Sequence, residues 1–273
     1  MFLNIAALSI RITSQEKPSR EEKLSYRFEN FVLKKRCAHP DIDLKLKVIP
    51  RFLRFDPKVL FATERETGLI KEGIAGMRRR RRIRLKRRQE NLRRIRMAMN
   101  VQKEEYLGKG IDWRLAELGD KFLLEGGTAG NFQVLLDKDL KKGEVFIIDA
   151  KGKWKLTDII YGFLQVLVIY YMAKYKLGIV THSAGIRDKN SGYLFIGKSG
   201  AGKSTSARIW DMHAKVRVLN DDRVIIRKEG RRFFIYGTPW HGDYSDYLKI
   251  SLEKATLNKM FFIYHREKNY AAR

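Results

Sequence analysis

The stretch that decides the fold of this chain is YLFIGKSGAGKS at residues 193–204. A short run of β-type residues, 193–196, leads into a turn that contains three glycines. Residues 197–204 match the Walker A pattern G-x-x-x-x-G-K-[ST] at every fixed position, and residues 204–212 can continue as a helix. Glycines let successive backbone N–H groups point at phosphate oxygens, and the helix N-terminus adds a partial positive charge. The stretch therefore predicts a phosphate-binding loop between a strand and a helix.

The residues before this loop predict a β-hairpin. Two β-type runs, 179–184 and 193–196, flank the turn-forming sequence RDKNSG at 187–192. Pairing in such a hairpin sets His182 beside the strand that enters the loop. An imidazole there can orient an aspartate or contact phosphate when it is protonated, although a lone strand histidine is more often structural.

A pair of carboxylates follows the predicted helix at short range. The strand-like run VRVLN at 216–220 ends in Asp221 and Asp222. One carboxylate of such a pair can hold Mg²⁺ through water, as a Walker B acid does, and the other can accept the proton of a substrate hydroxyl. Adjacent residues of a strand point to opposite faces, so both reach one site only if the chain bends there. A surface Asp pair in a hairpin turn is the alternative interpretation.

A loop of defined shape, YGTPWHGD at 236–243, follows the strand-like run 233–235. Its glycines and proline mark a turn rather than a helix or strand. In one interpretation Trp240 and His241 line a substrate or nucleotide pocket, and in the other they serve the fold alone. The sequence leaves both interpretations open.

The order of these features resembles the HPr kinase/phosphorylase-like family, which shares its nucleotide-binding core with ATP-dependent phosphoenolpyruvate carboxykinase. In that group a hairpin leads into the phosphate-binding loop, whereas most P-loop NTPases place the loop after the first strand of a parallel sheet. The resemblance covers about residues 156–265. It implies an α/β (α+β) fold with a phosphoenolpyruvate-carboxykinase-like P-loop core, preceded by a β-rich N-terminal region.

The resemblance also implies ATP and Mg²⁺ as cofactors and a role for each site residue. Asp221 would be the general base, His182 would support Asp221, and Lys203 would bind the phosphates. Ser204 and Asp222 would hold the metal ion. The nucleotide-binding residues would be Gly197, Lys198, Ser199, Gly200, Ala201, Gly202, Lys203, Ser204 and Thr205.

Several features differ from the family pattern. Thr205 stands where HPr kinases usually carry Glu, and their downstream substrate-recognition signature is not found. The Lys and His manganese ligands of a carboxykinase cannot be placed either. The last residues follow soon after a strand-like run at 260–264, so we expect the family core to continue beyond this sequence, which would then be a fragment.

These observations predict an ATP- and Mg²⁺-dependent phosphotransferase, a kinase related to HPr kinase that acts on a hydroxyl of a protein serine or of a small molecule. One alternative is a non-catalytic ATP-binding module that docks on a polyanion. A carboxykinase-type enzyme is the other. The sequence names neither the phosphoacceptor nor the oligomeric state, and a homo-oligomer is compatible with it.

The charge balance adds a second expectation. Lys and Arg number 57 against 31 Asp and Glu, a net charge of +26. Eleven Arg and one Lys stand at 78–96 against one acid, Glu90. This run lies in a predicted insertion at 64–106 and is either a solvated charged face or a nonspecific contact for nucleic acid or another polyanion. No aromatic residue stands at 68–102, so the run offers no platform on which bases can stack.

The first 150 residues read as mostly strand. The β-type runs are 3–12, 43–48, 132–135 and 145–148. We therefore expect two parts: a β-rich N-terminal region at 1–150, which carries the basic insertion, and a nucleotide-binding kinase domain at 151–273.

Composition excludes several other classes of protein. A hydrophobic content of 44% excludes a wholly disordered chain, and one cysteine, Cys37, excludes a disulfide framework. The longest apolar run, 159–173, is too short to span a bilayer and is interrupted by Gln165. We expect it to form a buried helix over 156–176 that ends at Gly178, in a cytoplasmic protein without a membrane span.

Overall fold

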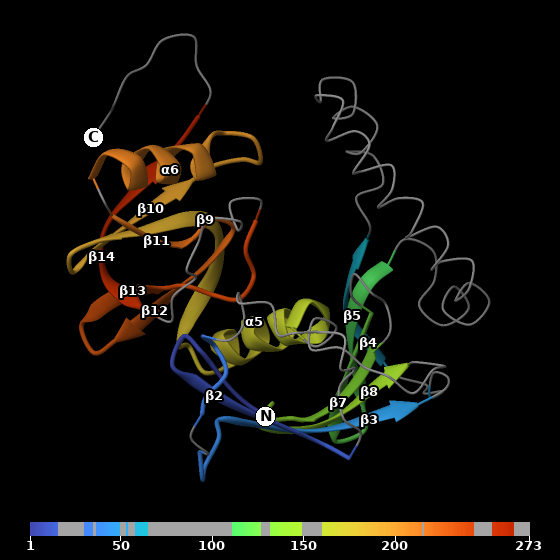
Figure 1. Ribbon diagram of the computed structural model, residues 1–273. Helices are drawn as coiled ribbons and strands as arrows, with labels where there is room; N and C mark the ends of the chain where they lie inside the picture. Colours follow the sequence, from blue (N-terminus) through green and yellow to red (C-terminus); the bar gives the residue numbers. More distant parts are fainter. Residues whose placement is uncertain are drawn as a thin grey trace. The chain divides into compact units, whose positions relative to one another are not determined.

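The computed structural model describes residues 1–15, 30–34, 37–49, 53, 58–64, 111–126, 132–148, 160–214, 216–242 and 253–264. This part of the chain is a mixed α/β structure that is rich in strands (Figure 1). Eight of its strands form one sheet and six form the other. The fold class predicted from the sequence is confirmed at this level. No helix among the described residues is long and apolar enough to cross a membrane.

The chain divides into two compact units, and the division is not a single cut near residue 150. Unit 1 contains residues 1–13, 20–44 and 164–273. Unit 2 contains residues 14–19 and 45–163. Residues 1–13 and 20–44 are therefore grouped with the predicted nucleotide-binding region.

Unit 2 is built from consecutive antiparallel strands in the order β8-β7-β6-β5-β4. These are β4 (Lys58–Glu64), β5 (Ile111–Leu118), β6 (Lys121–Gly126), β7 (Phe132–Asp137) and β8 (Lys142–Ile148). The strands predicted at 132–135 and 145–148 are confirmed. Apolar side chains of β6, β7 and β8 form one buried face of this sheet, on which Leu124, Val134 and Val145 lie opposite one another.

The predicted basic insertion connects two paired strands of unit 2. β4 and β5 are antiparallel neighbours, and Glu64 lies opposite Ile111. The chain between these two residues therefore leaves and re-enters the sheet at adjacent points. The arginine run at 78–96 itself lies outside the described residues.

The N-terminal run predicted as one strand at 3–12 is instead a hairpin. β1 (Phe2–Ile5) and β2 (Leu8–Ser14) pair antiparallel, and β3 (Ile42–Ile49) extends the strand predicted at 43–48 by a residue at each end. The turn residues Ala6 and Ala7 both have positive φ, 50° and 61°. Such turns usually contain Gly, Asn or Asp, so two alanines give no signal for the turn.

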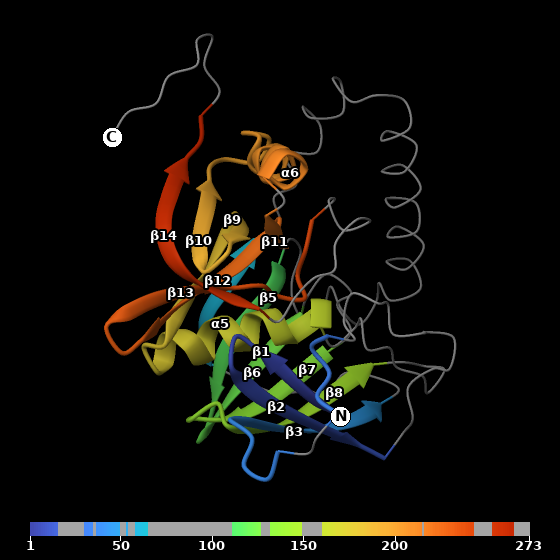
Figure 2. The same ribbon diagram turned by 60° about the vertical axis from the view of Figure 1, so that its left-hand side comes forward.

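The six-stranded sheet of unit 1 has the order β10-β14-β13-β12-β9-β11. Its elements are β9 (Gly178–Asp188), β10 (Ser191–Ile196), α6 (Lys203–Ala214), β11 (Arg217–Asn220), β12 (Arg223–Glu229), β13 (Arg232–Tyr236) and β14 (Lys254–Phe262). β10 pairs with β9 as well as with β14, so the pairings β10-β14-β13-β12-β9 close into a ring. β10 and β14 run side by side and parallel, with α6 following β10 (Figure 2).

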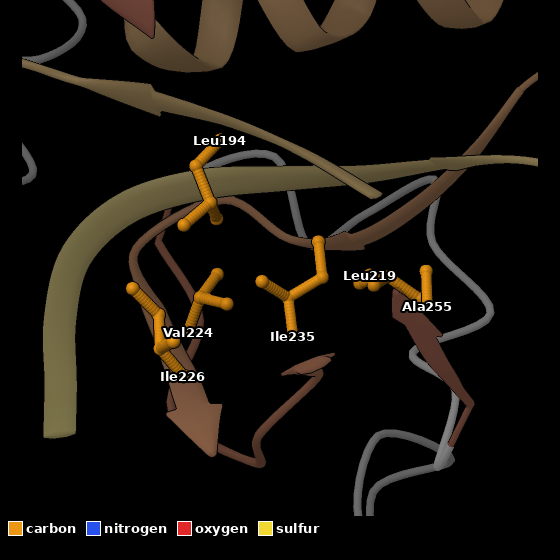
Figure 3. Packing of buried hydrophobic residues seen from close by; sticks show 6 residues of the cluster. All are labelled: Leu194, Leu219, Val224, Ile226, Ile235 and Ala255. Atoms are coloured by element: carbon orange, nitrogen blue, oxygen red, sulfur yellow. The ribbon is translucent and has the colours of Figure 1, made fainter. Parts of the chain in front are cut away.

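The core of this sheet is a cluster of aliphatic side chains that come from five of its strands (Figure 3). Its members are Leu194, Leu219, Val224, Ile226, Ile235 and Ala255. Burial of each large aliphatic side chain contributes about 1.5–3 kcal/mol to stability, so this cluster fixes the positions of β10, β11 and β12 relative to one another. β10 leads into the predicted loop, and the predicted Asp pair lies between β11 and β12.

The predicted buried helix is confirmed over residues 160–174, as a π-turn (Ile160–Leu164) followed by α5 (Gln165–Lys174). Gly178 does not end the helix, contrary to the prediction. The chain reverses at Lys176, with φ 53°, where Leu177 N donates to Met172 O at 2.9 Å, the bonding of a Schellman motif. Gly178 begins β9, and a Cβ there would lie 2.3 Å from Ile226 O, so the glycine permits close approach of two strands.

Candidate phosphate-binding site

The predicted hairpin and loop are present as the sequence indicated. β9 and β10 pair antiparallel, with Ile196 opposite Ser183, so His182 lies next to the end of the strand that enters the loop. The loop follows β10 directly, and α6 begins at Lys203. Gly200 and Gly202 have φ of 82° and 95°, and a Cβ at either would meet nothing within 4 Å. Positive φ favours glycine, and the space beside both residues is open to a ligand.

Lys203 is held inside its own loop. Its Nζ donates to Gly197 O at 2.9 Å and to Lys198 O at 3.0 Å, and the residue is 6% exposed. Burial lowers the pKa of this ammonium, while the charge of Asp222 acts in the opposite direction. The ammonium is therefore held against the carbonyl oxygens at the start of the loop, and Lys203 itself is the first residue of α6.

Asp221 and Asp222 stand at a bend between β11 and β12, as both would have to do in order to reach one site. Asn220 stabilises this bend. Its Oδ1 accepts hydrogen bonds from Asp222 N and from Arg223 N, both at 2.8 Å, which is the bonding of an Asx turn. The short polar side chain before the Asp pair therefore produces the change of direction that a regular strand would not allow.

His182 pairs with Asp222, and not with Asp221 as the family resemblance implied. His182 Nε2 lies 3.0 Å from Asp222 Oδ1. The cause is strand register, because Arg223 lies opposite His182 and Ser183 N donates to Asp222 O at 3.1 Å. Burial lowers the pKa of His182 despite the opposing charge of Asp222, and Nε2 is the ring nitrogen that faces the carboxylate.

Arg223 is the second partner of Asp222. Its Nη1 lies 3.0 Å from Asp222 Oδ1, the same oxygen that His182 contacts. The carboxylate is about one-third exposed, which is far more than its neighbour in the bend. Asp222 therefore combines solvent access with two fixed donors on one oxygen.

Asp221 is in a different environment. It is 3% exposed, and its Oδ1 accepts a hydrogen bond from Gly242 N at 2.8 Å. Its backbone oxygen accepts a hydrogen bond from Ser204 Oγ at 3.3 Å, so the bend lies directly beside the first turn of α6. The two carboxylates thus share one place in the fold but differ in access to solvent.

The loop at 236–242 supports the bend. Thr238 Oγ1 donates to Arg223 O at 2.6 Å, and Asn220 Nδ2 donates to Thr238 O at 2.8 Å. Trp240 is only 2% exposed, so it packs within the fold and does not line an open pocket. His241 has its Nδ1 3.2 Å from Gly242 O. The structural interpretation of Trp240 is the one that its burial favours.

Sequence reasoning missed three residues of this site, Asn220, Thr238 and Gly242. Asn immediately before an Asp pair is a signal for an Asx turn, and it could have been read. The other two act through contacts between distant parts of the chain, and no local pattern marks them. A Cβ at Gly242 would lie 2.8 Å from Asp221 Oδ2, so the glycine lets the loop pass close to the buried carboxylate.

The remaining predicted residues surround the loop. Lys198, Ser199 and Thr205 are exposed, and Ala201 is buried beneath the loop, where its N donates to Lys198 O at 3.1 Å. Among the described residues, no group of three or more His, Cys, Asp or Glu side chains is close enough to hold a metal ion. The donors available for Mg²⁺ here are the Ser204 hydroxyl and the two carboxylates, which suit a hard cation.

Comparison of the chain with models of known protein families found no match, and a search of curated proteins found no similar sequence.

Proposed function

We propose that this chain is an ATP- and Mg²⁺-dependent phosphotransferase, related to HPr kinase, that transfers the γ-phosphate to a hydroxyl acceptor. One observation carries the proposal. The loop that holds Lys203 and the bend that holds Asp222 meet at the hydrogen bond from Ser204 Oγ to Asp221 O. Phosphoryl transfer needs three things in one place: hydrogen-bond donors that bind the phosphates, ligands for the metal ion and an acceptor for the proton of the hydroxyl. The loop and the bend together carry residues of all three kinds.

The loop and the start of α6 would bind the phosphates. Lys203 Nζ exchanges the carbonyl oxygens of Gly197 and Lys198 for phosphate oxygens, which charge-assisted hydrogen bonds favour. Ser204 Oγ donates to the backbone oxygen of Asp221, and the Ser204 hydroxyl and the buried Asp221 carboxylate would be the metal ligands. Bound Mg²⁺ would neutralise charge on the phosphates during transfer.

The geometry favours Asp222 as the proton acceptor, in exchange with the role that the resemblance gave to Asp221. His182 and Arg223 both contact Oδ1 of Asp222, so Oδ2 can accept the proton of the acceptor hydroxyl. The acceptor oxygen then forms its bond to the γ-phosphorus as the bond to the β-phosphate oxygen breaks. Proton transfer to a positioned general base of this kind accelerates a reaction by about 10²–10⁴-fold.

The decisive experiment is transfer of label from γ-labelled ATP, with Mg²⁺, into an extract of the source cells, followed by identification of the labelled species. Asp222→Asn should bind Mg·ATP normally and lose at least a hundredfold in transfer rate. Asp221→Asn should instead raise the Mg²⁺ concentration needed for activity, because a neutral amide is a poorer ligand for a hard cation. Asp120→Asn, in an exposed turn between β5 and β6, is the matched control.

The outcomes separate the candidate functions. Tight ATP binding without acceptor-dependent transfer would identify a non-catalytic nucleotide-binding module. Turnover that depends on oxaloacetate would identify a carboxykinase-type enzyme. Equal activity of both Asp variants and wild type would remove the catalytic role of the bend.

A further inference from the structure

The end of β14 lies directly beside the first residue of the phosphate-binding loop. Ile263 N donates to Ile196 O at 2.7 Å, which extends the parallel pairing of β14 with β10. A Cβ on Gly197 would lie 2.6 Å from Ile263 O, so the two backbones touch where the loop begins. Residues 262–264 therefore border the loop itself.

Two large aromatic side chains at this end of β14 are exposed. Phe262 is 61% exposed and Tyr264 is 67% exposed. Their neighbour Phe261 is used in packing, because its ring stacks on Phe195 at 5.5 Å and contacts Trp210 of α6 at 6.1 Å. Phe262 and Tyr264 thus leave aromatic surface open to solvent beside a phosphate site, and such surface favours a binding partner.

The direction of a bound nucleotide follows from strand order. β10 lies between β9 and β14, and the pair of His182 with Asp222 is on the β9 side. In the proposed function the γ-phosphate faces Asp222, because the acceptor hydroxyl is deprotonated there. The nucleoside and the γ-phosphate are at opposite ends of the unbranched triphosphate chain, so we place the nucleoside on the other side of β10 from Asp222, where β14 borders the loop.

We propose that Phe262 and Tyr264 form a nucleobase subsite, on which the adenine ring of ATP stacks. This inference rests on the proposed function, because it uses the direction of the phosphates. Every nucleobase has a π-face that can stack on an aromatic ring. We therefore expect the subsite to raise the affinity for any nucleotide with a base, and to distinguish only weakly between adenine and guanine.

The test compares two ligands that differ only at the nucleoside end: Mg·ATP and the Mg²⁺ complex of inorganic tripolyphosphate. Wild-type protein should bind Mg·ATP at least fivefold more tightly in isothermal titration calorimetry. Tyr264→Ala or Phe262→Ala should lose about fivefold or more in ATP affinity and stay within twofold of wild type for tripolyphosphate. Phe233→Ala removes a 50%-exposed ring from β13 and is the matched control, with neither affinity changed.

The failures of the two proposals look different. Two results would overturn the subsite alone: wild-type protein binds Mg·ATP no more tightly than tripolyphosphate, or both β14 variants bind Mg·ATP as tightly as wild type. If tripolyphosphate binding still depends on Lys203, the phosphate-binding role of the loop stands. Absence of binding of either ligand to the wild-type protein overturns the proposed function and the subsite with it. The wild-type comparison needs no substitution, so the inference is tested even if a variant does not fold.

Discussion

Replacing Asn220 with alanine should destabilise the protein by about 3 kcal/mol. The side chain is fully buried and makes three hydrogen bonds of 2.8 Å, accepting from Asp222 N and Arg223 N and donating to Thr238 O. Each of these hydrogen bonds contributes about 1 kcal/mol net to stability. In the alanine variant the three backbone groups lose the Asn220 side chain as their partner. Total stability of a domain is about 5–15 kcal/mol, so the loss is large but leaves the protein folded.

The measurement is urea-induced unfolding, with the slope m required to stay constant so that the change reflects stability. Asn258→Ala is the matched control, because that exposed side chain reaches Ser191 Oγ and Tyr193 Oη only at 3.5 Å and should change stability by less than about 0.5 kcal/mol. Asn220→Ala should also lower kcat more than it raises KM, because it loosens the bend that carries Asp222. A loss below about 0.5 kcal/mol would refute the role of Asn220 in stabilising the bend.

Four further predictions test the site and its surroundings. Lys203→Ala should weaken Mg·ATP binding by about 10- to 100-fold in calorimetry, because the phosphates lose a charged donor; wild-type affinity would contradict the phosphate loop. Gly242→Ala should cost about 1–3 kcal/mol in thermal or urea unfolding, since its Cβ would meet Asp221 Oδ2 at 2.8 Å; an unchanged midpoint would show that the 236–242 loop moves freely. The folded-state pKa of His182 is lowered, so below about pH 6.5 the unfolded chain binds a proton that the folded chain does not, and stability falls with falling pH. His182→Gln should therefore flatten the pH dependence of the unfolding midpoint on the acid side, and an identical slope would contradict this. Deletion of residues 67–102 should leave Mg·ATP affinity unchanged and reduce retention on heparin, most strongly at low salt; unfolding of the deleted protein would mean that the segment is structural.

The parts of the fold that the sequence predicted are those with local signals. The hairpin of β9 and β10 follows from two apolar runs around a turn sequence, and the loop after it follows from glycine spacing and a lysine. The bend at the Asp pair also follows from local geometry, because two adjacent residues of a regular strand cannot both reach one site. In each case the information lies within eighteen consecutive residues or fewer.

The parts that the sequence did not predict depend on register and on distant contacts. Which carboxylate lies beside His182 depends on the register of β9 and β12, in which Arg223 lies opposite His182. A shift of this register by one residue would have brought Asp221 to His182 instead. Gly242 N reaches Asp221 Oδ1 across 21 residues of sequence. The Ala6–Ala7 turn was missed for another reason, since neither residue prefers the positive φ that it adopts.

The ring of strand pairings has a consequence for the order of assembly. β9 and β10 are joined by a tight turn and pair early, but the ring closes only when β14, the last strand in the sequence to join it, binds β10. Pairings between segments far apart in sequence form slowly, because loop-closure entropy opposes them until the contacts are made. During synthesis, therefore, the loop at 197–204 follows a strand with one partner, and the second partner of that strand is available only after β14 has left the ribosome. A refolding experiment that follows hydrogen exchange should accordingly see the amides of β10 that face β14 protected later than those that face β9.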